Sequence, residues 1–380
     1  MNKHRDNAAL KGGAAAHLAE ESNSNENPGA ESATVQRDFY VRARKICSDL
    51  FEPNPAWYWA DFLLSVFTAY GLASVFLELS LTSPIAWICF FPACVLVYRA
   101  SLFVHEIVHF PRNEMKAFRW VWNFLAGAPM MVPSFSYESH THHHSSRHYG
   151  TEHDGEYLPL ASGTLSGIFV FMAQVFFQPL LVFLRYLIGP LSFLHPILRQ
   201  WTLTHASSLV INFKYHKDAD QVKHSREDTF WEVMTYVRVW AMVAVVVFGI
   251  MPWTRLPKML LIAMFVLTLN HIRTLAAHRY RSQGETISHL EQFQDSTNIT
   301  GKWYTELICP VGLRYHALHH LFPGIPYHNL GTAHRRLMSE LPEGSIYHQS
   351  VYPGFRSVIG ELVETVRKPH EERDIVGRQA

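Results

Sequence analysis

The sequence predicts an all-α integral membrane protein of about four transmembrane helices, with a cytosolic helical cap that holds a histidine-rich site for two metal ions. Two observations carry this prediction. Long apolar segments, each sufficient to cross a bilayer as a helix, alternate with polar stretches. Histidine is abundant, at 24 of 380 residues, and it gathers in three short clusters beside those segments.

Composition excludes several other classes of protein. The formal net charge is +1, so the chain lacks the basic excess of a nucleic-acid-binding protein. Its 4 cysteines form no C-x-x-C pair, which argues against a disulfide framework, a thiolate zinc site or an iron–sulfur cluster. We expect the cysteines to be small apolar packing residues.

The N-terminal part is polar. Residues 1–36 lack the apolar core of a signal peptide, and we predict a disordered tail there. Residues 37–50 mix apolar and basic side chains, which fits either an amphipathic helix on the membrane surface or a short soluble helix before the first span. Residues 37–380 are predicted to form one membrane domain.

Four apolar runs are predicted to cross the membrane, at about 57–79, 84–104, 231–251 and 256–274. The link between the first two carries no Lys or Arg, whereas both outer flanks are basic. The positive-inside rule therefore places the outer flanks on the cytoplasmic side. The membrane is expected to be a bacterial inner membrane or that of the endoplasmic reticulum. The cytosolic cap is expected to comprise residues 105–160 and 278–380.

Two further segments, 117–137 and 165–198, are apolar but interrupted by prolines. If all the histidine clusters lie on one side of the membrane, the second segment crosses either zero times or twice. We predict zero crossings, with 117–137 at the membrane interface and 165–198 an interfacial or re-entrant segment.

Three histidine clusters, here called the first box (residues 105–109), the second box (140–144) and the third box (316–320), supply the candidate metal ligands. Their neutral imidazoles are good ligands for iron, zinc, copper or nickel. In each H-x-x-H-H box the first two members are expected to face one way, with the adjacent third turned by about 100° toward a second metal. The predicted ligands in the boxes are His105, His109, His140, His143, His144, His316, His319 and His320.

A ninth candidate, His278, follows the last span. It is preferred to His271 because it is nearer the cytoplasmic end, although an interfacial histidine bonding a backbone carbonyl is an alternative. Nine imidazoles exceed what one ion can hold. Shared between two ions, they leave coordination positions open for a reactant, and an open site indicates chemistry rather than structural support.

The boxes HEIVH, HTHHH and HALHH resemble those of the membrane fatty acid desaturase superfamily, over about residues 55–340. Ala276-Ala-His278 is similar to the lone histidine ligand after the last span of stearoyl-CoA-type members. The resemblance implies a non-haem centre of two irons, dioxygen as cosubstrate, and desaturation of a fatty acyl or other lipid chain. The four-residue spacing of the first box differs from the stearoyl-CoA type and leaves the substrate open.

Other functions remain compatible with the boxes. A hydroxylase or ketolase of the same superfamily, acting on a lipid, sterol or carotenoid, shares the first hydrogen abstraction with a desaturase. The first box also satisfies H-E-x-x-H, the zinc protease signature, with Glu106 as general base. That alternative leaves the second and third boxes unexplained.

Hydrogen-bonding groups are expected to fix the imidazoles from outside. The candidates besides Glu106 are Asp154, Glu156, Asn270, Asp295 and His334. Electrons are expected from a separate ferredoxin, rubredoxin or cytochrome b5, because the chain carries no redox-cofactor motif of its own. Arginines near the boxes are predicted either to dock that donor or to contact lipid headgroups: Arg147, Arg279, Arg281 and Arg335.

Overall fold

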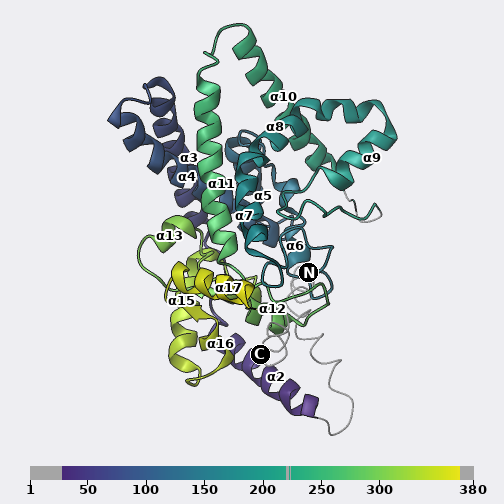
Figure 1. Ribbon diagram of the computed structural model, residues 1–380, viewed down its shortest axis with the longest axis vertical. Coiled ribbons are helices and arrows are strands. Elements are labelled where there is room, and N and C mark those ends of the chain that lie inside the picture. Colours follow the sequence, from purple (N-terminus) through teal and green to yellow (C-terminus); the bar gives the residue numbers. More distant parts are fainter. Residues whose placement is uncertain (1–27, 220–221, 223, 369–380) are drawn as a thin grey trace, which may run out of the picture.

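The computed structural model describes residues 28–219, 222 and 224–368, and these are mostly helical (Figure 1). Four helices are long and apolar enough to cross a membrane. They are α3 (Pro55–Glu78), α4 (Pro84–His109), α10 (Arg226–Val247) and α11 (Arg255–Leu275). The predicted all-α fold with about four spans is therefore confirmed.

Local signals explain where these helices begin. Proline occupies the first turn of α3 and of α4, where its missing N–H costs nothing, and the Asn54 side chain accepts a hydrogen bond from Ala56 N at 3.0 Å. Helix α10 begins with a capping box between Ser225 and Asp228. Helix α4 continues to His109, so the first box is the last turn of the second span rather than a segment after it.

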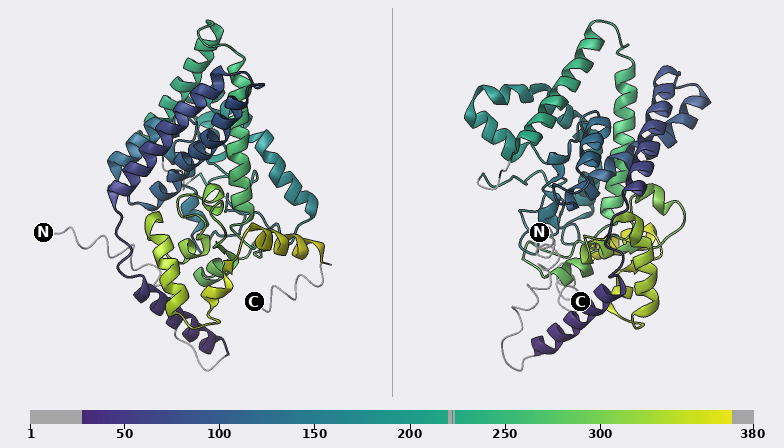
Figure 2. Two further views of the ribbon diagram at one scale, coloured as in Figure 1. Left: turned by 90° about the vertical axis from the view of Figure 1, so that its left-hand side faces the viewer. Right: turned by 180° about the vertical axis from the view of Figure 1, so that it is seen from behind.

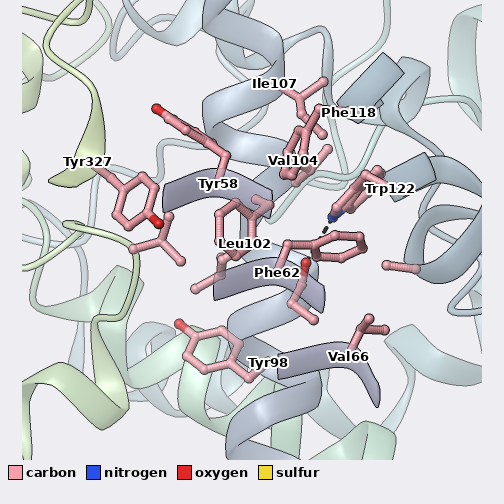
Figure 3. Packing of buried hydrophobic residues seen from close by; sticks show 14 of the residues in the cluster. Tyr58, Phe62, Val66, Tyr98, Leu102, Val104, Ile107, Phe118, Trp122 and Tyr327 are labelled. Atoms are coloured by element: carbon pink, nitrogen blue, oxygen red, sulfur yellow. Dashed lines mark hydrogen bonds between the residues drawn. The ribbon is translucent and has the colours of Figure 1, made fainter. Parts of the chain in front are cut away.

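Helices α3 and α4 pack together along their length, and α5 closes the end that carries the first box (Figure 3). Tyr58 and Phe62 of α3 lie against Phe118 of α5, with ring centroids 5.7 and 5.5 Å apart. Trp122 is fully buried, and its indole N–H donates to the Ala100 carbonyl at 2.8 Å. This aromatic cluster fixes the end of α4, and with it the first box.

The remaining elements are short. Between α4 and α10 lie α5 (Lys116–Trp122), η1 (Asn123–Gly127), η2 (Ser134–Tyr137), α6 (His140–His143), α7 (Leu165–Ala173), η3 (Gln174–Phe176), α8 (Gln178–Ile188), η4 (Gly189–Leu194) and α9 (Pro196–His205). After α11 come α12 (His289–Asp295), β1 (Asn298–Ile299), α13 (Thr305–Ile308), α14 (His316–Leu321), α15 (Tyr327–Glu340), α16 (Ile346–Gln349), β2 (Val351–Tyr352) and α17 (Phe355–Arg367). Strands β1 and β2 pair in parallel.

These elements sort into two regions. The ends of α10 and α11 that are joined to each other lie at the top of Figure 1, and α12 to α17 lie below the four long helices in all three views (Figures 1 and 2). The boxes fall where the two regions meet, because α4 ends, α6 lies and α14 begins there.

The two broken apolar segments differ from the long helices. The structure divides 117–137 into α5, a π-helical turn and a 3-10 turn. Residues 165–194 form two helical pieces bent by 48°, which by length and composition could be one broken span or a re-entrant loop. Their interfacial placement stays a prediction.

The N-terminal helix α2 spans Pro28–Ile46 and packs against α15. Its first turns fall in the predicted disordered tail, so the prediction is wrong for residues 28–36; residues 1–27 lie outside the described part of the chain. The prediction weighed polarity alone, whereas Ala30, Glu31 and Ala33 are residues that favour a helix. Its last turns bury Ala43 fully.

Candidate metal centre

Backbone hydrogen bonds bring the ninth histidine to the third box. His278 forms an isolated antiparallel bridge with Ser296 just after α11 ends. Thr297 N donates to the Ala277 carbonyl, and Ala317 N donates to the Thr297 carbonyl, both at 2.9 Å. Three chain segments distant in sequence therefore run side by side, which places His278 against α14.

All nine predicted histidines lie together, in two groups. In each group every member offers one ring nitrogen, and these nitrogens all lie within 4.8 Å of one another. The five-histidine group contains His105, His109, His140, His144 and His319. The four-histidine group contains His143, His278, His316 and His320.

In the five-histidine group the Nε2 atoms converge. The Nε2 atoms of His140 and His144 are 3.0 Å apart, and His319 Nε2 is 3.1 Å from both His109 Nε2 and His144 Nε2. Two imidazole nitrogens bound at right angles to one metal, each at about 2.1 Å, would lie about 3 Å apart. The spacing therefore fits a metal ion.

The four-histidine group has the same spacing. His278 Nε2 lies 2.9 Å from His316 Nε2 and 3.2 Å from His143 Nε2, and His316 Nε2 is 3.2 Å from His320 Nε2. All four side chains are buried. A buried ring of imidazole nitrogens this close is favourable when a cation lies among them, because their lone pairs otherwise repel.

Acidic partners orient the second box from outside. Asp154 Oδ2 lies 2.8 Å from His143 Nδ1, and Glu156 Oε1 lies 2.9 Å from His140 Nδ1. Each Nδ1–H donates to its carboxylate, which leaves the Nε2 lone pair of the same ring free for a metal. Glu156 also accepts from the Tyr137 hydroxyl at 2.8 Å.

Tyr149, Tyr157 and Asp295, here called the tyrosine relay, support His278. The Tyr149 hydroxyl donates to Asp295 Oδ2 at 2.7 Å and lies 2.9 Å from His278 Nδ1. Since its one hydrogen is committed to the carboxylate, the oxygen accepts from Nδ1–H, and His278 Nε2 is left as the bare ligand atom. Tyr157 donates to the same Asp295 oxygen at 2.9 Å. Sequence reasoning named Asp295 but missed both tyrosines, although they lie beside and shortly after the second box.

Burial also favours the neutral ligand form. Burial, together with the charges of neighbouring imidazoles, lowers the pKa values of His140, His144, His316, His319 and His320. His143 is different: burial lowers its pKa, but the Asp154 charge and hydrogen bond outweigh it, so that the pKa is raised. The Asp154 carboxylate thus counteracts the effect of burial on His143.

The Nδ1 atoms of His144, His316, His319 and His320 are buried without a hydrogen-bond partner among the described residues, and so are both ring nitrogens of His105. Buried polar atoms are seldom left unpaired in this number. Metal binding in the five-histidine group would give one nitrogen of His105 a partner, whereas the four Nδ1 atoms point away from the converging Nε2 atoms and would not contact the metal.

The division within the second and third boxes differs from the prediction. His140 and His144 share the five-histidine group while His143 belongs to the other, so the middle member of the box crosses over. In the third box His316 and His320 stay together, and His319 crosses. Residues four apart differ by about 40° around a helix and residues three apart by about 60°, so the outer pair shares a face more closely.

Several other predicted residues lie away from both groups. Asn270 accepts from the Arg273 guanidinium at 3.2 Å, and His334 Nδ1 contacts the Tyr347 hydroxyl at 2.8 Å. Neither contacts a box histidine, so the structure does not support their predicted role in orienting ligands. His271 Nδ1 lies 2.9 Å from the Leu267 carbonyl, which agrees with the preference for His278.

The contacts of Glu106 do not fit the general base of a zinc protease. Its carboxylate accepts from the Tyr58 hydroxyl at 2.6 Å and from Tyr327 N at 3.0 Å, and its other oxygen is 3.8 Å from His105 Nδ1. The first box, moreover, shares its group with three histidines from the second and third boxes. The arrangement therefore argues against the zinc protease alternative.

The predicted docking arginines have different surroundings. Arg279 donates to Tyr352 and to two backbone carbonyls, and Arg281 lies 3.4 Å from Glu361. Arg335 donates to Thr332 at 3.1 Å within α15. Arg147 is exposed, and within the described part of the chain its guanidinium has no hydrogen-bond partner. The Arg279 guanidinium is thus held by internal hydrogen bonds, which the predicted docking role did not take into account.

Four candidate membrane spans with nine clustered histidines indicate one class of membrane protein, and comparisons with known proteins agree with that class. The chain belongs to the fatty acid desaturase family, whose profile matches residues 81–352. It is 36% identical over 337 residues to the ceramide hydroxylase of Caulobacter vibrioides (strain NA1000 / CB15N), an alignment that covers 87% of this chain and 95% of that protein. No solved structure matches the chain.

These findings confirm the resemblance drawn from the boxes. They favour the hydroxylase alternative over the desaturase that the boxes suggested first. Boxes alone could not separate the two, because both reactions begin by removing hydrogen from the same kind of C–H bond.

Proposed function

We propose that this protein is an O2-dependent hydroxylase of ceramide or a closely similar amide-linked lipid. The observation that supports it best is the likeness to a ceramide hydroxylase along 95% of that protein's length. Two groups of imidazoles, each suited to one metal ion, would form the active site.

We propose two iron ions as the cofactor, one in each group. When bound, the irons would reduce dioxygen to an oxidant strong enough to attack an unactivated C–H bond. All-imidazole sites also bind zinc, and the affinity order favours zinc over ferrous iron, so zinc in a preparation would not contradict this proposal.

The chain's own residues hold the ligands in place. Asp154 and Glu156 each accept the Nδ1–H of a ligand, and Tyr149 accepts that of His278. These bonds fix the tautomer and the ring plane, so each Nε2 is presented without rearrangement. Burial of the four-histidine group excludes water from its surroundings.

The overall reaction balances with an external reductant. One C–H bond of the lipid breaks and one C–O bond forms with one atom of O2, and the other atom leaves as water with two protons and two electrons. The electrons would come from a ferredoxin, rubredoxin or cytochrome b5 type of protein. We propose Arg147 as part of its docking surface, because that guanidinium is exposed and uncommitted among the described residues.

The membrane arrangement follows the charge pattern. We propose that residues 105–160 and 278–380 form a cytoplasmic cap over the spans. Several large apolar side chains of the broken segments are exposed, including Phe124 at 64%, Phe169 at 73% and Leu194 at 76%. In a membrane protein such exposed apolar surface faces lipid, which supports an interfacial position.

Lipid mass spectrometry tests the proposal. Cells expressing the protein together with an electron donor should accumulate ceramide that has gained one oxygen atom, derived from isotopically labelled dioxygen. The variant His143→Ala should give none. Lipid that instead lost two hydrogen atoms would show a desaturase, and unchanged ceramide beside modified acyl esters would contradict the proposed substrate class.

A further inference from the structure

A cavity of about 570 Å³ lies between the end of α4 and the start of α10, and we call it the α4–α10 cavity. Its lining includes Ile107 and Val108, which lie between the two ligands of the first box, and Ser139 and Thr141, which flank His140. The volume is typical of a small-ligand site. The cavity thus shares its walls with the first and second boxes without containing a ligand of either group.

The cavity lies at the depth of the membrane where the polar headgroup of a lipid is expected. The last turn of α4 and the first turn of α10 are the ends of two candidate spans. Span ends lie at the boundary between hydrocarbon and water, where headgroups are found. Arg112 at the cavity has a side chain that is 54% exposed, so the cavity meets the surface there.

Hydrogen-bond donors on its wall lack partners. Ser139 and Trp231 are 5% and 4% exposed, and neither Ser139 Oγ nor Trp231 Nε1 has a hydrogen-bond partner among the residues that the structure describes. The Lys217 ammonium forms no hydrogen bond or ion pair with any described residue. Buried donors without acceptors are costly, and a ligand that supplies acceptor oxygens would remove that cost.

The charges of the wall argue against an anionic ligand. Arg112 lies 2.8 Å from Glu138 and 3.5 Å from Asp228, so its charge is already matched. Arg119 donates to the carbonyls at the end of α4, at 3.1 and 3.2 Å. Glu227 adds a third carboxylate to the wall. A phosphate or a coenzyme A moiety would meet three carboxylates and one uncommitted cation.

We propose that the α4–α10 cavity binds the uncharged, amide- and hydroxyl-bearing headgroup of the lipid substrate, through Ser139, Trp231 and Lys217. This inference rests on the proposed lipid hydroxylase and assigns its substrate site. Amide and hydroxyl oxygens match the unpaired donors, and an uncharged group avoids the carboxylates. The cavity therefore selects an amide-linked lipid over an acyl-coenzyme A.

Two conservative variants test the cavity in the full-length, iron-loaded enzyme. Trp231→Phe keeps the ring and removes the N–H, and Lys217→Met keeps the apolar stem and removes the ammonium. One lost hydrogen bond should raise the apparent KM for ceramide in mixed micelles by roughly threefold to tenfold, with kcat within about twofold. Matched controls are Trp240→Phe, 51% exposed on the same helix, and Lys214→Met, exposed on the same loop; both should leave KM unchanged.

The result separates this inference from the proposed function. If wild-type enzyme hydroxylates ceramide while both test variants keep its KM, the cavity assignment is overturned and the function stands. A wild-type preference for acyl-coenzyme A or ceramide phosphate over ceramide overturns the assignment of an uncharged headgroup.

Thermal stabilisation of purified protein by ceramide provides a readout that needs no turnover. If no lipid is turned over, the proposed function fails. The cavity inference then stands only when ceramide stabilises the wild type and both controls more than Trp231→Phe and Lys217→Met. Iron content and melting temperature without lipid, equal to wild type, show that the variants fold.

Discussion

The two histidine groups differ in how they are attached to the rest of the molecule. The five-histidine group includes the last turn of a membrane span, and its His109 and His144 are partly exposed. The four-histidine group takes every member from segments outside the four long helices, and all are buried. One group is thus attached to a candidate span and the other to the shorter elements, and His143 and His319, the middle members of two boxes, connect the two groups.

The largest effect is expected when a crossing member is removed. His143→Ala or His319→Ala should abolish activity while the protein still inserts in the membrane, because each loss opens one group and detaches the box from it. Product formation and membrane content measure this. His153→Ala, partly exposed shortly after the second box and in neither group, is the control. Full activity in either variant would remove that histidine from the ligand set.

Removing the carboxylate that accepts from a box histidine should affect metal binding in one group more than in the other. Asp154→Asn weakens the contact to His143, and Glu156→Gln weakens the contact to His140. Each should lower activity or metal affinity by roughly 10–100-fold. The first variant should lose metal from the four-histidine group and the second from the five-histidine group, as Mössbauer spectra of iron-loaded protein would resolve. Equal depletion of both positions in both variants would refute independent anchoring.

A smaller effect is expected from the tyrosine relay. Tyr149→Phe removes the acceptor of His278 Nδ1–H and one donor to Asp295, so metal affinity should fall by roughly threefold to tenfold. Iron titration of the purified protein measures this. Tyr304→Phe, at an exposed position, is the matched control. An unchanged affinity would mean that Ser296, 3.2 Å from the same nitrogen, suffices.

The smallest effect on activity is expected at His334, which lies outside both groups. His334→Gln should keep activity within about twofold at neutral pH, in contrast to every box histidine. Burial lowers the pKa of His334 from 6.5 to about 4, so protons bind the unfolded chain more tightly. This contribution to stability is intact above pH 6.5 and is lost as the pH falls toward 4, by up to about 3 kcal/mol. Melting temperatures should therefore fall less steeply with acid in the variant, and parallel slopes would contradict this.

Sequence reasoning found the spans and the nine clustered histidines because both depend on local patterns. A run of apolar residues reveals its own length, and histidines three or four apart share a helix face wherever the helix lies. The division between groups could not be predicted, because 40° and 60° offsets are too similar without the position of the other boxes. Asn270 and His334 were predicted to orient ligands but contact no box histidine, because a residue's type does not fix where its side chain points.

The parts contributed by tertiary contacts were also out of reach. Tyr149 supports His278 across 129 positions of the chain, and no spacing rule connects them. The α4–α10 cavity likewise combines a span end, a loop and another span start. The choice between desaturation and hydroxylation was also out of reach, because the boxes describe the oxidant and not the fate of the carbon; the likeness to a ceramide hydroxylase favours the second reaction.

The crossing of box members has a consequence for biogenesis. Neither group is complete until the third box, near the far end of the chain, has left the ribosome. By then all four long helices have been synthesised, so the proposed iron sites can be completed only after the candidate spans have been made. Until then each group lacks its third-box members, and a truncation before residue 316 should yield inserted protein that does not retain the proposed pair of irons.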